Sequence, residues 1–558
     1  MIKKQSTTKG FAILGAASIF NKVLSIIYVP FLTFLISDYG NGIANTGYTI
    51  YLLVFQITYM GIPVAISKIV SEQVALGQYR NSLRTLKISG IMLVSLGIVL
   101  TLSTAFCAHW LADMSGRPTA YLTLLALSPT VLLASISATF RGYFQGRHNM
   151  VPTSISQIVE QAFNTVCTLA FAWWMLKIGR HQAGILGITG EEQISLYSFQ
   201  WGAAGSAMGT SAGALVSMIY LIITFVRNRK SMHDEAEKEA RDYPNSSLLL
   251  TKQIVHMVLK YSVPITLGVI IVYSANFVDL IFTNNRLVYA GFSNTDATKL
   301  FGILTTQYQK LINVPLALAN TLAIVLLPSI SSAATLQNRN LLHRKIYNGI
   351  RSMFIVTIPS AVILAVMAEP IIQLLFSEKY THGVDLLVIG SWVIILTAFV
   401  QIQTSIIQGI GHMHRPTIHM AIALVLKIII NYILIGIPAI NIRGAVAGTM
   451  ICYGLAGLLN YRYMCKLTGF RTRWFMLLTP PMISSLIMAV AMFVVWHGLD
   501  ALLKTALPGN YIRNLVSTIP ALAIGGAVYG AALLLLKGIF LEEVRQIPVV
   551  GNIIKRRL

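Results

Sequence analysis

Runs of about 20 or more apolar residues recur along the whole chain. A run of this length is what a helix needs to cross ~30 Å of hydrocarbon, whereas the strands of outer-membrane barrels alternate over ~10 residues. Hydrophobic residues make up 55% of the 558 residues and charged residues only 11%, against roughly 25% charged residues in soluble domains. The sequence therefore predicts an all-α polytopic membrane protein with about 14 transmembrane helices, the first of them a retained helix and not a removable signal peptide.

The placement of the basic residues decides what the net charge of +23 means. A single basic patch would suit a nucleic-acid partner, but the Lys and Arg residues are spread over the loops. With a cytoplasmic N-terminus, the inner loops carry about three times as many of them as the outer loops, which is the positive-inside rule. We therefore expect a protein of the cytoplasmic membrane with both termini in the cytoplasm and no nucleic-acid partner.

A polar hinge occurs twice between apolar runs. The stretch RGYFQGRHNMVPTSISQIVEQ at 141–161 has a fainter copy, IIQGIGHMHRPTIHM, at 406–420. A second pair, GIPVAIS at 61–67 and NVPLALA at 313–319, occurs in the same order at a similar offset. Six predicted spans separate the copies, and an even number returns the chain to the same side of the membrane. The halves are therefore predicted to be parallel repeats, an arrangement found in transporters.

The repeat predicts two six-helix lobes, residues 1–227 with helices 1–6 and residues 254–466 with helices 7–12. A mixed-charge segment without apolar periodicity, 228–253, joins them on the cytoplasmic side, with Pro244 as a breaker. Residues 467–558 are expected to hold two extra C-terminal helices, 13 and 14, and a cytoplasmic tail.

The hinge itself is typical of the inner ends of two spans. We expect Arg141 and Arg147 to lie in the phosphate region of the lipid, Gly142 and Gly146 to permit a tight turn, and Pro152 to begin the next span.

Two acidic residues lie well inside predicted spans. Glu160 is costly in hydrocarbon unless it faces protein or water, and Gln157 and Asn164 share its helix face, so a structural polar cluster and a functional site are both open. Asp279, with Asn276 one turn earlier, either holds a coupling cation or pairs with a lysine.

Two lysines inside predicted spans indicate a functional site more clearly than the acidic residues do. Lys22 lies in the first span, in IFNKVLSII, and Lys310 lies early in the eighth, in YQKLINVP. Each costs ~2.5 to 3.5 kcal/mol in lipid on insertion scales, so each is expected to face a cavity or a partner, unless it snorkels to an interface. Two cations in opposite lobes suit a pyrophosphate headgroup. Lys310 is also a possible partner of Asp279.

Four longer stretches resemble the multidrug/oligosaccharidyl-lipid/polysaccharide (MOP) exporter superfamily, in particular its stage V sporulation protein B and lipid II flippase branch. They are GIPVAISKIVSEQVALGQY, RGYFQGRHNMVPTSISQIVEQ, NFVDLIFTNNRL and QKLINVPLALANTLAIVLLPSIS. The resemblance spans nearly the whole chain. It implies an alternating-access carrier that moves a polyprenyl-pyrophosphate-linked sugar across the membrane for cell-wall synthesis.

The resemblance also bears on the lysines. Flippases of this branch carry a cationic residue before a Val-Leu pair on the first helix, matched by Lys22, and one before Leu and a later Pro on the eighth, matched by Lys310. Better-known members have further basic residues where this chain has Tyr28, Gln56 and Thr58, so the resemblance implies a less positive cavity here.

The remaining polar residues are weaker candidates. Asn21, Glu160, Asn276 and Asp279 are expected to be polar cavity or ion-coupling residues. Lys427 lies in mid-span, and we expect a structural role without an identifiable partner. The loop histidines and the four cysteines have no metal-ligand spacing, so no metal site is expected.

No phosphate loop, nucleophile elbow or pair of catalytic carboxylates is present in the sequence. We therefore expect a transporter that is not an enzyme, acts as a monomer, needs no cofactor, and is coupled, if at all, to the membrane potential or a monovalent cation. Its partners would be the bilayer and a lipid-linked oligosaccharide, with lipid II preferred over a teichoic-acid or capsule precursor. A multidrug cation antiporter and a non-transporting scaffold for wall or spore assembly are the alternatives.

Overall fold

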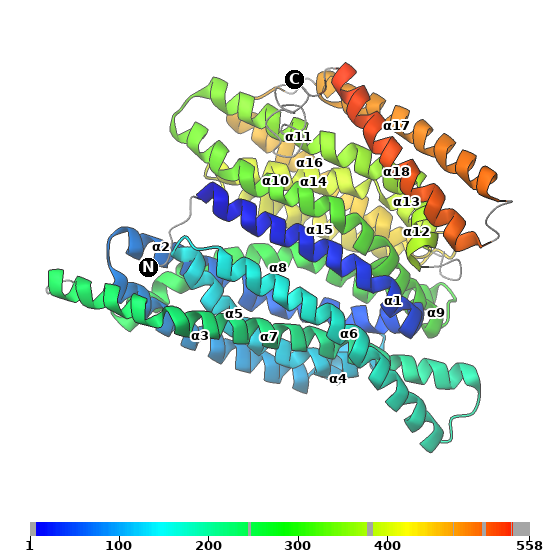
Figure 1. Ribbon diagram of the computed structural model, residues 1–558, viewed down its shortest axis with the longest axis horizontal. Helices are drawn as coiled ribbons and strands as arrows, with labels where there is room; N and C mark the ends of the chain where they lie inside the picture. The colour runs from blue at the N-terminus through cyan, green and yellow to red at the C-terminus, as the bar shows by residue number, and fades with distance from the viewer. Residues whose placement is uncertain are drawn as a thin grey trace. The chain divides into compact units, whose positions relative to one another are not determined.

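The computed structural model describes residues 7–243, 247–376, 383–471, 474–504, 509–536 and 538. In this part of the chain every regular element is a helix (Figure 1). Ten of the described helices are long and apolar enough to cross a membrane, or up to eleven if the bent pair α13 (Val384–Gly390) and α14 (Val393–Gly409) counts as one span. The prediction of an all-helical multi-pass membrane protein is confirmed, while the total of 14 spans and the two lobes stay a prediction.

One compact unit contains the chain up to Thr306 together with Met420–Gly448. It holds α1 (Thr7–Gln56), η1 (Ile57–Gly61), α2 (Ile62–Ala75), α3 (Tyr79–Phe106), α4 (Ala108–Met114), η2 (Pro118–Ala120), α5 (Tyr121–Gly146), α6 (Val151–Ile185), α7 (Glu191–Asp242), α8 (Thr251–Tyr289), α9 (Asn294–Gly302) and most of α15 (Arg415–Leu434).

The second unit contains Gln307–His419 and the chain from Thr449 onward. It holds α10 (Gln309–Thr335), α11 (Arg339–Val366), α12 (Ala368–Phe376), α13, α14, most of α16 (Arg443–Thr468), α17 (Trp474–Leu503) and α18 (Asn510–Leu535). The π-helical segment η3 (Ile303–Tyr308) lies at the boundary of the two units.

The order and length of the helices recur along the chain. α3 and α11 both have 28 residues, and a short helix, α4 or α12, follows each of them. The two sequence copies GIPVAIS and NVPLALA begin at or just after a π-helical segment, η1 and η3 respectively. η1 ends at the first residue of GIPVAIS, whereas η3 ends at Tyr308, before NVPLALA begins, and the internal repeat stays a prediction.

The hinge at 141–161 differs from its expected geometry. Arg141 and Arg147 are only 4% and 7% exposed, so neither anchors the chain in lipid phosphates. Gly142 and Gly146 lie inside α5, where an added Cβ would come within 2.7 Å of the Pro63 carbonyl oxygen or of the Val70 Cβ. These glycines therefore allow α5 to pack closely on α2.

The turn itself depends on a different residue. His148 supplies it, with φ 56, a left-handed conformation that a short loop often needs. Pro152 does lie in the first turn of α6, as predicted.

The predicted linker is partly helical. α7 continues to Asp242 and ends two residues before Pro244. Glu235 of this extension forms an ion pair with Arg147, and Glu239 accepts a hydrogen bond from the backbone NH of Arg80 at 2.7 Å. Burial alone lowers the pKa of Arg147, but the contacts with Tyr143 and Glu235 outweigh it and raise the pKa above its ordinary value. The first half of the segment 228–253 is therefore fixed to the hinge.

Small residues bring α7 against α6. Gly205, Gly209 and Gly213 recur at helical spacing, and an added Cβ at these positions would come within 2.3 to 2.6 Å of α6 backbone atoms. Close backbone approach through small residues is typical of membrane helices. At Gly213 the neighbouring atom is the carbonyl oxygen of Glu160, so this packing positions the polar residues of α6.

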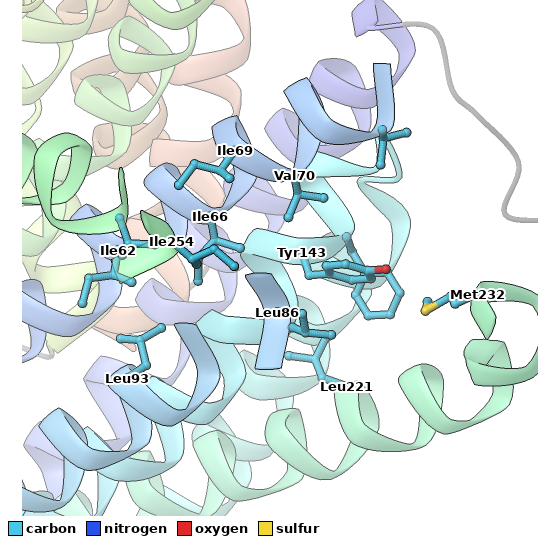
Figure 2. Packing of buried hydrophobic residues seen from close by; sticks show 13 residues of the cluster. Ile62, Ile66, Ile69, Val70, Leu86, Leu93, Tyr143, Leu221, Met232 and Ile254 are labelled. Carbon is cyan, nitrogen blue, oxygen red and sulfur yellow. The ribbon is translucent and has the colours of Figure 1, made fainter. Parts of the chain in front are cut away.

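Figure 2 shows the apolar core beside the hinge, with side chains from α2, α3, α5, α7 and α8 and including Tyr143 of the hinge itself. Ile66, Val70, Leu93, Phe144 and Tyr143 are fully buried there. Burying each such side chain contributes ~1.5 to 3 kcal/mol where water is the alternative. This core stabilises α5, α7 and α8, which carry Arg141, Ser217 and Asp279 of the polar clusters described below.

Candidate functional site

Lys22 is an exposed residue in the N-terminal part of α1. The preceding residue, Asn21, is half-buried, and its side-chain oxygen has no hydrogen-bond partner among the described residues. A buried polar atom of this kind is costly unless something else satisfies it. The expectation that these two residues line a cavity stays a prediction.

Lys310 is the second residue of α10 and is half-buried. α9, η3 and α10 form one continuous helical segment, Asn294–Thr335. Position 310 lies 16 residues after its start, which corresponds to ~24 Å of helix. Both the cavity position and the interfacial alternative for Lys310 stay predictions.

Glu160 belongs to a hydrogen-bonded cluster centred on Arg141. The Arg141 guanidinium donates to the Glu160 carboxylate at 2.6 Å, to the Tyr59 hydroxyl at 2.9 Å, and to the hydroxyls of Ser156 and Ser217 at 3.0 and 2.8 Å. One arginine thereby connects η1, α5, α6 and α7. Charged hydrogen bonds in such a setting are among the stronger polar contacts in proteins.

The two ends of this ion pair differ in exposure. The Arg141 side chain is 4% exposed, whereas that of Glu160 is 33% exposed. The expected partners of Glu160 have other contacts: Gln157 donates to Tyr59 at 3.4 Å, and Asn164 accepts from Thr168 at 2.8 Å. Glu160 is therefore anchored by a cation, while a third of its side chain remains exposed.

Asp279 is part of a second, sealed ion pair. Lys427 of α15 donates to its carboxylate at 2.8 Å and to the Ala275 carbonyl oxygen at 2.9 Å, and Asn431 donates to the other carboxylate oxygen at 2.7 Å. The Lys427 and Asp279 side chains are 1% and 5% exposed. Asp279 therefore pairs with Lys427, for which the sequence identified no partner, and not with Lys310, its possible partner in the sequence. Asn276, predicted beside it, lies on the exposed side of α8.

Sequence reasoning missed a polar pocket formed within the first unit. A cavity of about 390 Å³ is lined by Asp113, Gly116, Pro118, Asn284, Asn285, Val288 and Asn294. The signal was present in the polar runs ADMSGRP at 112–118 and TNNRL at 283–287, which the topology places on the same side of the membrane. Only the fold brings these two runs together. Among the described residues, no group of His, Cys, Asp and Glu is arranged to hold a metal ion.

Comparison with known proteins places the chain in a family. The polysaccharide biosynthesis protein family model matches residues 7–334, and a second model of the same description matches residues 297–385. The lipid II flippase MurJ of Bacillus subtilis (strain 168) is 24% identical over 93% of this chain and 94% of its own length. Stage V sporulation protein B of the same organism is 25% identical over 99% of this chain and 100% of its own length.

A solved structure shares the fold. The inward-facing conformation of a multidrug resistance MATE family transporter of the MOP superfamily aligns with a TM-score of 0.62 at 15% identity, covering 84% of this chain and 96% of the other. The chain is a member of the polysaccharide biosynthesis protein family, and it is similar over nearly its whole length to the MurJ flippase and stage V sporulation protein B of Bacillus subtilis (strain 168).

Proposed function

We propose that this protein is a flippase that moves a polyprenyl-pyrophosphate-linked saccharide, lipid II by preference, across the cytoplasmic membrane by alternating access. The cargo is an anion, and Lys22 and Lys310 would contact its pyrophosphate. Asn21 and Glu160 would offer hydrogen bonds to sugar hydroxyls. The lobes would rock around the headgroup, the extra helices α17 and α18 would border the lipid tail, and the protein would act as a monomer without a cofactor.

The charge of the spanning segments carries this proposal. The two carboxylates that the sequence places well inside spans, Glu160 and Asp279, are each neutralised by a basic residue. A carrier of organic cations needs an accessible negative charge, and at Asp279 the lysine already occupies the carboxylate. Lys22 and Lys310 add two basic residues to these segments, and basic residues suit an anionic cargo better than the organic cation of a multidrug antiporter.

The Asp279–Lys427 ion pair also limits what can drive transport. A coupling cation at Asp279 would have to displace Lys427, which is buried and held by two acceptors. We therefore propose that the membrane potential, and no bound cation at Asp279, favours outward movement. An inside-negative potential contributes ~2.3 kcal/mol per negative charge per 100 mV in that direction.

Growth complementation of a flippase-depleted bacterial strain tests the function. Lys310→Gln and Lys22→Gln should each lose most activity at normal membrane levels, because a desolvated charge contact of ~2 to 5 kcal/mol corresponds to tens to thousands of fold in affinity. Lys310→Arg should keep substantial activity. Lys260→Gln, at an exposed lysine of α8, is the matched control and should grow normally. Full growth of both Gln variants would favour the scaffold alternative.

Thiol labelling tests the orientation. In a background without the four native cysteines, cysteines at Ser231 and Gln337 should be shielded in intact cells from an impermeant reagent, because both positions are predicted to be cytoplasmic. A cysteine at Asn294 should react. Labelling at Ser231 would reverse the predicted topology.

A further inference from the structure

The polar pocket of the first unit has the composition of a saccharide site. Asp113, Asn285 and Asn294 are exposed and bring one carboxylate and two amides to its wall, and Pro118 and Val288 add apolar surface. Carboxylates and amides bind hydroxyl groups as acceptors and donors, and small apolar patches accommodate the C–H face of a sugar ring. The cavity of about 390 Å³ lies within the ~300–1,000 Å³ range of small-molecule sites.

The wall of this pocket is built by three segments that the chain brings together. Asn284, 2% exposed, donates to the Gly116 carbonyl oxygen at 2.9 Å and to the Asn294 side-chain oxygen at 3.3 Å. It thereby ties the loop after α4 to the end of α8 and the start of α9. An added Cβ at Gly116 would come within 2.3 Å of Asn284 and 3.0 Å of Asn285, so glycine is required for this arrangement.

Two buried residues at or next to this wall, Asn284 and Arg117, have side-chain polar atoms without a hydrogen-bond partner among the described residues. The side-chain oxygen of Asn284 is buried and has no partner among the described residues, and two guanidinium nitrogens of Arg117 are in the same condition. Arg117 is 2% exposed, donates to the Leu280 carbonyl oxygen at 3.4 Å, and stacks at 4.3 Å on the Phe301 ring. A buried group of this kind is costly, and a hydroxylated ligand or its bound water in the pocket would satisfy the side-chain oxygen of Asn284, which lines it.

From these observations we propose that the pocket between α4, α8 and α9 is a saccharide-binding site on the outer side of the membrane, separate from Lys22 and Lys310. Its single carboxylate disfavours a phosphate group, and with only one carboxylate it is a poor site for a divalent cation. The sugar comes either from a headgroup that has just crossed the membrane or from a glycan chain already outside. The position of the site on the outer side depends on the proposed topology, whereas its ligand class is inferred from the geometry alone.

Saturation-transfer NMR on the purified full chain in nanodiscs tests this site, with N-acetylglucosamine and its β-1,4-linked tetramer as probes. Binding should weaken by roughly 2- to 10-fold for each lost hydrogen bond in Asn285→Ala and Asp113→Asn. Gln193→Ala, at an exposed amide elsewhere, should bind normally. A tetramer that binds much more tightly than the monosaccharide identifies a glycan chain as the source, and equal binding identifies a headgroup sugar.

Several outcomes would overturn the proposal. One is the absence of saturation transfer to either sugar, and another is undiminished transfer in both pocket variants. A third is that calcium or inorganic phosphate binds, the pocket variants abolish this binding, and the sugars do not bind. The double variant Lys22→Gln/Lys310→Gln should bind free sugar like the wild type. If this double variant grows normally, the flippase proposal is refuted but the sugar-binding result for the pocket is unaffected. The two proposals are therefore tested separately.

Discussion

Two ion pairs join helices of the same unit, and they differ in access to their surroundings. Asp279 and Lys427 are both at most 5% exposed, whereas Glu160 keeps a third of its side chain exposed beside a buried Arg141. A sealed pair has no surface left for a ligand, so its role is to hold α8 and α15 together. A pair with one open carboxylate holds helices together and also presents a polar group. Exposure, and not charge alone, separates structural from functional candidates here.

Breaking the sealed pair should have the largest effect. Lys427→Met leaves the Asp279 carboxylate buried without its cation, which should lower the free energy of unfolding by ~3 to 5 kcal/mol. The double variant Lys427→Met/Asp279→Asn should regain most of this loss, because it removes the stranded charge. Thermal unfolding in detergent, followed by size-exclusion chromatography, measures both. A single variant as stable as the wild type would show that the pair is not a structural contact.

Removing Arg141 should cost less. In Arg141→Gln the hydroxyls of Tyr59, Ser156 and Ser217 lose their donor, but the partly exposed Glu160 can be hydrated. We expect a loss of ~1 to 3 kcal/mol in the same unfolding assay. If Arg141→Gln destabilises the protein more than Lys427→Met does, exposure does not rank the two pairs.

Replacing Glu160 sharpens the comparison, since it separates stability from function. Glu160→Gln keeps the shape and one acceptor, so stability should fall by about 1 kcal/mol or less. If the open carboxylate contacts substrate, growth complementation should fall at unchanged membrane levels. Asp279→Asn is the informative counterpart, because any loss of growth there should be accompanied by lower stability. Normal growth of Glu160→Gln would leave Glu160 with a structural role alone.

A solvent-exposed ion pair should contribute least to the free energy of unfolding. Arg241 and Glu237 on the α7 extension are 3.9 Å apart, with side chains 81% and 69% exposed. Arg241→Gln should change the free energy of unfolding by less than about 0.5 kcal/mol, because water screens such pairs. A change as large as that of Arg141→Gln would mean that the extension contributes more to the fold than its exposure suggests.

The sequence predicted the parts of this protein that depend on local pattern. Apolar runs predicted helices, which the structure confirms, whereas the repeat predicted from the copies of GIPVAIS and of the hinge stays a prediction. Pairings between distant helices were not predictable. Nothing near Lys427 in the chain points to Asp279, 148 residues away, and Arg141 resembled a lipid anchor because its partners come from three other segments. The polar pocket of the first unit was missed for the same reason.

Transport of the cargo by the purified protein tests the central claim most directly. Proteoliposomes with a short-chain fluorescent lipid II in both leaflets should lose the protected inner fraction to an external glycan-cleaving enzyme at a rate that depends on the protein. Lys310→Gln should slow that rate at least tenfold, a loss of about 1.4 kcal/mol or more, and Lys260→Gln should match the wild type. Equal rates for wild type, Lys310→Gln and protein-free vesicles would contradict the assignment of this chain as a flippase for lipid-linked saccharides.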